Sequence, residues 1–325
     1  MTSRRGVVTL LACLGMLAGL VGPVAAQEIK LPAGKKFTIG WSNASLGNPW
    51  RIAMVEMVKE EAKKYPNVTL LITNAEDKAA KQIADSEDLL AKGVDLLLLS
   101  PTTFQGVNPV VDKAAEKKVP LVVVQRETSN RNYTALVWND DVSLGMMAGI
   151  EMARLLGNEG KVAMIEGIAG ASSSLGRTQG VKAALALQPN VKLVASQPGD
   201  YQEAKAITAM ENILQANPDL QGVVAQSGTM ARGALKALRN AGMAGKVLVV
   251  SIGSENHVLK EIKRGGMHST VMEPTRVGVE GFRVSLRLLA GEKLPKLNPT
   301  FAPVVNSYNV DQWVKMDGPD DSWVW

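Results

Sequence analysis

Cysteine is almost absent from this sequence. The single cysteine among the 325 residues is Cys13, which lies in an N-terminal segment that we expect to be removed. Without cysteine, the rest of the chain can form no disulfide, no thiolate metal site and no cysteine nucleophile. An oxidising compartment is therefore permitted by the sequence but not required by it.

Groups typical of catalysis are also scarce. The two histidines, His257 and His268, lie away from any serine and aspartate pairing that suggests a triad, and we expect both on the surface. The sequence has no paired histidine and carboxylate spacing for a metal, and no glycine-rich phosphate motif ending in Gly-Lys-Ser/Thr. Basic residues alternate with acidic ones, which argues against nucleic-acid binding. We predict a protein that is not an enzyme and needs no metal or cofactor.

The first 26 residues have the pattern of a secretory signal peptide. Arg4 and Arg5 form a basic start, residues 7–20 are almost wholly apolar, and residues 24–26 give a small-residue cleavage pattern. The apolar stretch is short for a retained membrane helix, and no later stretch is long enough to span a bilayer. Because cleavage removes two arginines and no acidic residue, the formal net charge falls from +5 to +3.

From residue 37 onward, strand patterns alternate with helix patterns. Four such units, each about 27 residues long, precede residue 138, a spacing that predicts right-handed crossovers in a parallel sheet. A similar series of strands and helices fills the second half. Two α/β units in series predict two lobes with a cleft between them.

The stretch 121–127 suggests where a ligand would bind. Its aliphatic run, residues 121–124, fits a strand that is buried on both faces, and it ends at Gln125 and Arg126. Ligands of open α/β sheets bind beyond the carboxyl ends of the strands. A strand that simply stops at a solvated polar turn is the alternative interpretation, but other strands of this chain also end in polar residues.

The strand ends carry amides, guanidinium groups, hydroxyls and aromatic rings. Amides and guanidinium groups can form paired hydrogen bonds to neighbouring hydroxyls, and aromatic rings can cover the C–H faces of a sugar or polyol. Core packing is an equal alternative for Trp50, whereas Tyr201 lies in a polar loop. The candidate ligand-binding residues are Asn48, Trp50, Gln125, Arg126, Arg177, Tyr201, Ser227 and Glu273.

Five loop segments and one arginine together resemble one protein family. They are Gly47-Asn-Pro-Trp50, Val124-Gln-Arg126, Gly167-Ile-Ala-Gly170 with Arg177, Gln197-Pro-Gly-Asp-Tyr201 and Ala225-Gln-Ser227. From about residue 37 to about 303, the chain resembles the ribose/galactose-type periplasmic binding proteins, the solute receptors of ABC importers, whose fold is shared with LacI-type repressors. The resemblance implies two Rossmann-like lobes with parallel sheets, joined by a three-segment hinge that closes on one small molecule. It implies an N-terminal lobe of residues 37–138 and 274–298, a C-terminal lobe of residues 139–273 and 299–318, and a tail of residues 319–325.

The resemblance also carries residue roles and departures from them. Asn48, Trp50, Arg126, Arg177 and Tyr201 match ligand contacts of the family. Ribose-type members carry aspartate before the arginine, where this chain has Gln125, and asparagine and aspartate after the Ala-Gln pair, where it has Ser227 and Gly228. They also carry aspartate after the next strand, where this chain has Gly253, and glutamine at the last crossing, where it has Glu273. The lost carboxylates predict a site that is more positive than usual, suited to a polyol, a sugar acid or another oxygen-rich solute.

The leading hypothesis is therefore a monomeric receptor in the periplasm that hands a small carbohydrate-like ligand to an inner-membrane ABC permease. A sensory receptor for a furanose-like signal molecule, acting through a membrane kinase or chemoreceptor, is the alternative. A DNA-binding repressor is disfavoured because the leader replaces the helix-turn-helix that such a protein needs. An enzyme is disfavoured because no acid, base or nucleophile constellation is visible. No role is assigned to the tail with Trp323 and Trp325.

Overall fold

The structure, a computed structural model, describes residues 29–320 and residue 322. The signal peptide expected at residues 1–26 and the tryptophans of the tail lie outside the described residues. None of the helices in the described part is both long and apolar enough to cross a membrane.

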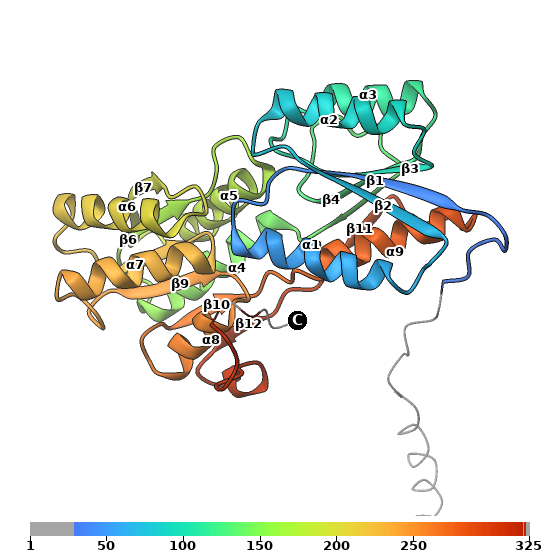
Figure 1. The fold of residues 1–325 in the computed structure, drawn as a ribbon. Coiled ribbons are helices and arrows are strands. Elements are labelled where there is room, and N and C mark those ends of the chain that lie inside the picture. The colour runs from blue at the N-terminus through green and yellow to red at the C-terminus, as the bar shows by residue number, and fades with distance from the viewer. Residues whose placement is uncertain (1–28, 321, 323–325) are drawn as a thin grey trace, which may run out of the picture. The chain divides into compact units, whose positions relative to one another are not determined.

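The first lobe is built on a sheet of parallel strands. In spatial order the strands are β11 (Leu297–Pro299), β5 (Ala135–Trp138), β4 (Leu121–Gln125), β3 (Leu96–Ser100), β1 (Phe37–Asn43) and β2 (Val68–Asn74). Helices α1 (Pro49–Ala62) and α9 (Val277–Leu289) cover one face, and α2 (Ala79–Ala91) and α3 (Asn108–Glu116) cover the other (Figure 1). The central strands β3 and β4 are buried throughout, as expected for aliphatic strands with helices on both faces.

The second lobe repeats this plan. The strand order is β12 (Val304–Asn306), β10 (Ser269–Val271), β9 (Leu248–Ile252), β8 (Gly222–Ala225), β6 (Gly160–Glu166) and β7 (Val191–Pro198), and only β12 is antiparallel to its neighbour. Helices α4 (Asp141–Leu155) and α5 (Ser172–Ala186) pack in one core, and α6 (Glu203–Ala216), α7 (Gly228–Asn240) and α8 (Asn256–Lys263) pack in the other with the 3-10 turn η1 (Val310–Gln312).

The chain passes between the two sheets three times. It crosses from β5 to α4, from β10 to α9, and from β11 to β12. The predicted fold class, two α/β lobes with parallel sheets and a three-segment hinge, is therefore confirmed. The residue-level lobe boundaries stay predictions.

Three local predictions were wrong. Strand β11 falls in the Pro-rich segment 294–303, which the sequence pattern does not mark as strand, and β12 directly follows that segment. Each strand is only three residues long and lies at a sheet edge, where proline is tolerated. The helical sequence pattern predicts a helix that starts at Arg177, whereas α5 begins at Ser172, five residues earlier. His257 is buried rather than exposed and His268 is half-buried, because neighbouring backbone covers both.

Candidate functional site

All eight residues singled out from the sequence line one cavity between the lobes. Six further residues complete its wall: Arg51, Ser173, Thr229, Ile252, Gly253 and Glu255. The cavity lies where strands of both sheets end, as at β4 with Gln125 and at β9 with Ile252. The structure thus brings the predicted residues together at the edge that parallel α/β sheets use for ligands.

Two of these residues hold an unusual backbone conformation. Gln125 has φ +69° and Tyr201 has φ +59°. Non-glycine residues seldom adopt this left-handed region, and the strain is retained mainly where the surrounding structure fixes it, often at ligand sites. At Gln125 the turn ends β4 and brings the next residue, Arg126, to the cavity wall.

Arg51 is a buried cation in this wall that sequence reasoning missed. Its Nη1 donates to Asn43 Oδ1 at 3.1 Å and to Ser100 Oγ at 2.6 Å, and its Nη2 donates to Gln125 Oε1 at 2.8 Å. Burial, followed by the charge of Arg126, lowers the pKa of Arg51 to about 9, so the guanidinium is still charged at neutral pH. Its position in the first turn of a helix that follows a strand-end loop was the available signal.

Arg126 belongs to the first lobe but faces an aromatic ring of the second. Its Nη1 donates to the carbonyl oxygens of Pro101 and Thr102, whereas its buried Nε has no hydrogen-bond partner among the described residues. Its guanidinium carbon lies 5.9 Å from the ring centroid of Tyr201, and that of Arg177 lies 6.0 Å from it. The ring is therefore within cation–π range of two guanidinium groups. Burial raises the pKa of the Tyr201 phenol, which lies 3.0 Å from Ser173 Oγ.

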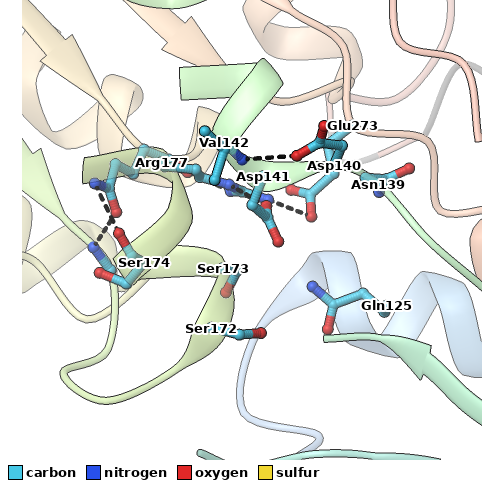
Figure 2. A network of polar contacts seen from close by, with 12 residues as sticks. Gln125, Asn139, Asp140, Asp141, Val142, Ser172, Ser173, Ser174, Arg177 and Glu273 are labelled. Carbon is cyan, nitrogen blue, oxygen red and sulfur yellow. Dashed lines mark hydrogen bonds and ion pairs between the residues drawn. The ribbon is translucent and has the colours of Figure 1, made fainter. Parts of the chain in front are cut away.

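Arg177 connects two of the three crossing segments. Its Nε donates to Asp141 Oδ1 at 2.8 Å, its Nη1 donates to the carbonyl of Gln226 at 2.6 Å, and its Nη2 forms an ion pair with Glu273 Oε1 at 2.5 Å. Figure 2 shows Arg177 beside Asp141, at the start of α4, and Glu273, which precedes α9. Sequence reasoning missed Asp141, although it follows the strand end at Trp138.

Asp141 is the most strongly perturbed carboxyl of this network. Burial raises its pKa to about 7; Arg177 opposes the shift and the charge of Glu273 adds to it. Burial and the neighbouring charge of Glu273 together outweigh the effect of the guanidinium, so Asp141 retains its proton more readily than an exposed aspartate does.

Three predicted residues also have structural duties. Asn48 Oδ1 caps α1 by accepting from the backbone N–H of Arg51, and Ser227 Oγ caps α7 by accepting from Met230 N. Trp50 is half-buried, and its indole N–H donates to the backbone carbonyl of Glu273 at 3.1 Å. The indole therefore connects α1 of the first lobe with the crossing that leads from β10 to α9.

Glu255 is a further carboxylate that sequence reasoning missed. It is 2% exposed, lines the cavity just before α8, and accepts from Thr229 N at 3.0 Å through Oε1. Burial raises its pKa above the ordinary glutamate value. Its position in the polar loop after β9 was the available signal.

The cavity wall carries three guanidinium groups and two carboxyls, and a third carboxyl, that of Asp141, contacts Arg177. The guanidinium groups are those of Arg51, Arg126 and Arg177, and the carboxyls are those of Asp141, Glu255 and Glu273. Carboxyl groups are therefore present in this region, although they come from other sequence positions than those that the family resemblance marks for carboxylates. Among the described residues, no group of three or more His, Cys, Asp or Glu side chains could hold a metal ion.

The comparisons with known proteins agree with this geometry. Residues 39–293 match the model of the periplasmic binding protein domain. The chain belongs to this family of periplasmic binding proteins. It is 33% identical over 285 residues to the ribose import binding protein RbsB of Salmonella typhimurium, covering 87% of this chain and 95% of the relative.

Two solved structures of similar periplasmic binding proteins contain ligands. The periplasmic binding protein component of the arabinose ABC transporter from Shewanella sp. ANA-3, bound to α- and β-L-arabinofuranose, is 28% identical with a TM-score of 0.80, covering 85% of this chain and 93% of that one. An ABC transporter solute binding protein from Bacillus halodurans C-125 with bound myo-inositol is 25% identical with a TM-score of 0.82, covering 86% and 97%.

The C-terminal segment of this periplasmic binding protein contacts the helix that follows Glu255. Asn256 N donates to Ser322 O at 2.9 Å, and its Nδ2 donates to Lys315 O at 2.7 Å. The backbone N–H of His257 donates to Asp320 O at 3.0 Å. The backbone N–H groups of the first two residues of α8 are therefore paired with carbonyl oxygens of the tail, to which the sequence alone assigned no role.

Proposed function

We propose that this protein is the substrate-binding component of an ABC importer, and that it binds a small neutral sugar or polyol in the cavity between its lobes. The observation that carries the proposal is the cavity itself. In one wall it combines guanidinium, carboxylate and amide groups with two aromatic side chains, Trp50 and Tyr201. Such a set can pair with many hydroxyl groups while the rings cover C–H faces. Its similarity to a ribose import binding protein and to the binding protein component of an arabinose ABC transporter supports the same class of ligand.

In this proposal each lobe supplies part of the ligand shell. Arg126 donates from its unpaired Nε, and Gln125 and the amide nitrogen of Asn48 add contacts from the first lobe. Ser227, Glu273 and Arg177 act from the second lobe, Arg177 mainly by fixing the carboxyl groups that it contacts. Trp50 and Tyr201 stack on the ligand.

A neutral ligand suits this wall better than a sugar acid. Arg177 already contacts the carboxyl groups of Asp141 and Glu273, and Arg51 is engaged by Asn43, Ser100 and Gln125. Burying an additional carboxylate would therefore require a cation that is not already committed. Within the described residues, Arg126 still has an unpaired donor, its Nε, but a single N–H donor can bind a ligand hydroxyl as well as a ligand carboxylate.

The remaining parts of the proposal concern the cell. We infer that the protein works in the periplasm as a monomer without catalytic activity, and that its partner is an inner-membrane ABC permease. The same cavity would serve a sensory receptor. Uptake assays distinguish the two roles, because only a transport component makes uptake of the ligand depend on the protein.

A calorimetric and thermal-shift screen tests the ligand class. The panel contains D-ribose, L-arabinose, xylitol and myo-inositol, with D-gluconate, a nucleoside and an amino acid as other classes. We expect at least one neutral sugar or polyol to bind and raise the melting temperature, because a ligand that binds only the folded state stabilises it. Binding of only the nucleoside or the amino acid would refute the proposed ligand class.

A further inference from the structure

The carboxylate of Glu255 occupies space that two glycines leave empty. A Cβ atom added to Gly228 or to Gly253 would overlap Glu255 Oε2. These are two of the positions where the family resemblance leads one to expect aspartate. The longer side chain of Glu255 reaches the same gap from a third position, so a carboxylate is present there although both expected aspartates are absent.

The two oxygens of this carboxylate are in different situations. Oε1 accepts from the backbone N–H of Thr229 at 3.0 Å and lies 3.4 Å from its hydroxyl. Oε2 is fully buried and has no hydrogen-bond partner among the described residues. A buried acceptor without a donor is costly, whereas a charge-assisted bond from a ligand hydroxyl would remove that cost. Since Glu255 lines the cavity, a ligand bound there can supply the donor.

We propose that Glu255 Oε2 accepts a hydrogen bond from a ligand hydroxyl, and that this contact selects neutral polyhydroxyl ligands over those carrying a carboxylate. The inference rests on the proposed function and deepens it by naming a residue that determines specificity. A hydroxyl group satisfies Oε2 by donation, whereas a ligand carboxylate in the same place has no proton to donate and is repelled. Glu273, which lines the same cavity on the crossing from β10 to α9, adds to the repulsion of a ligand carboxylate.

The test measures binding by calorimetry at pH 7.5 for the wild type and for Glu255→Gln. The ligands are D-ribose, L-arabinose, xylitol, myo-inositol and D-gluconate. We expect the wild type to bind a neutral member of this panel, and Glu255→Gln to bind it about 10- to 100-fold more weakly, the range for one hydrogen bond to a charged group. We also expect the ratio of gluconate affinity to that of the neutral ligand to rise in Glu255→Gln.

A matched control is the buried Glu61, which pairs with Lys64 and Arg283 and does not line the cavity. Glu61→Gln should bind like the wild type. Where Glu255→Gln does not fold, Glu255→Asp replaces it, because aspartate keeps the charge but withdraws the carboxylate from the gap.

The outcomes separate the two proposals. If the wild type binds a neutral ligand and the Glu255 variant binds it within threefold, the inference is overturned and the proposed function stands. If the wild type binds gluconate most tightly, the selectivity is overturned, although the protein remains a binding protein. If the wild type binds no member of the panel, the inference fails together with the proposed ligand class.

Discussion

Ser172 Oγ, in the first turn of α5, accepts a hydrogen bond of 2.8 Å from the backbone N–H of Glu127, which lies just beyond β4. The serine belongs to the second lobe and Glu127 to the first. A second such link runs from Phe104 N to Gly170 O at 2.8 Å. The lobes are therefore joined directly beside the cavity, away from the three crossing segments, and the structure has the closed arrangement of a hinged binding protein.

Replacing Ser172 by alanine should weaken this closure. The variant loses one interlobe hydrogen bond, worth about 0.5–1.5 kcal/mol, so we expect ligand affinity to fall about 2- to 13-fold, mostly through faster dissociation. Stopped-flow dissociation rates check this. Ser143→Ala is the control, because Ser143 also lies in the first turn of a helix but bonds to Asp140 within its own lobe. Equal dissociation rates for Ser172→Ala and the control would contradict the prediction.

Replacing Arg126 by alanine should greatly reduce binding while the fold survives. The unpaired Nε is the donor that we assign to the ligand, and one hydrogen bond from a charged group corresponds to about 10- to 100-fold in affinity. Calorimetry measures the effect, and circular dichroism confirms the fold. Arg131→Ala is the control, because Arg131 is an exposed arginine that does not line the cavity. Unchanged affinity in Arg126→Ala would remove this residue from the binding site.

The alternation of strands and helices made the two lobes predictable, and the polar residues at the strand ends made the position of the cavity predictable. Gln125 and Arg126 could be placed because a parallel strand must deliver its next residues to the carboxyl edge of the sheet. Arg51 could not be placed in this way. It lies on a helix beside charged residues that are exposed, and only the depth of that helix against β1 and β4 makes the guanidinium a buried group.

Side-chain length explains the other omission. The resemblance directs attention to residues 228 and 253, where both positions are glycine, and it therefore predicts that the carboxylates are lost. Glu255 lies two residues further along the chain. That its carboxyl group returns to the gap depends on the backbone path before α8, which no local sequence pattern specifies. Glu255 was therefore missed as a cavity residue.

The protonation of Asp141 should make stability depend on pH. Its pKa is about 7 in the folded protein, against an ordinary value of 3.8, so the folded state binds more protons between these values. The stabilisation from this group is therefore fully present below about pH 4 and is lost as pH rises through 7. The charged groups acting on it are Arg177, Glu273 and Arg126.

Urea unfolding of the wild type and Asp141→Asn at pH 4.5, 6.0 and 7.5 measures this contribution. Other titrating groups are common to both proteins, so they largely cancel in the comparison. We expect the free energy of unfolding of the wild type, relative to Asp141→Asn, to decrease as pH rises across this series. A difference that does not change with pH would show that Asp141 is ionised throughout.

Replacing Asn256 by alanine should loosen the C-terminal segment. Its side chain donates to Lys315 O and accepts from Lys315 N, so the variant leaves part of the tail contact unsatisfied. We expect a loss of about 1–3 kcal/mol in the free energy of unfolding and faster hydrogen exchange in residues 315–320. Asn240→Ala, at the exposed end of α7, is the control. Unchanged exchange in the segment would contradict a role for Asn256 in holding it.

Replacing Gly228 by alanine should displace the carboxylate of Glu255. The added methyl group overlaps that carboxylate and also approaches Val258, so we expect Gly228→Ala to cost about 1–3 kcal/mol of stability, the usual range for overpacking. In a Glu255→Ala background the carboxylate is gone and part of the overlap disappears. The cost of Gly228→Ala should therefore be smaller there, which gives a coupling energy between residues 228 and 255.

Gly47→Ala, at an exposed glycine of the first lobe, is the control, and its cost should be additive with that of Glu255→Ala. Denaturant unfolding of the single and double variants measures both cycles, and additive costs at Gly228 and Glu255 would mean that the carboxylate does not occupy the gap in solution.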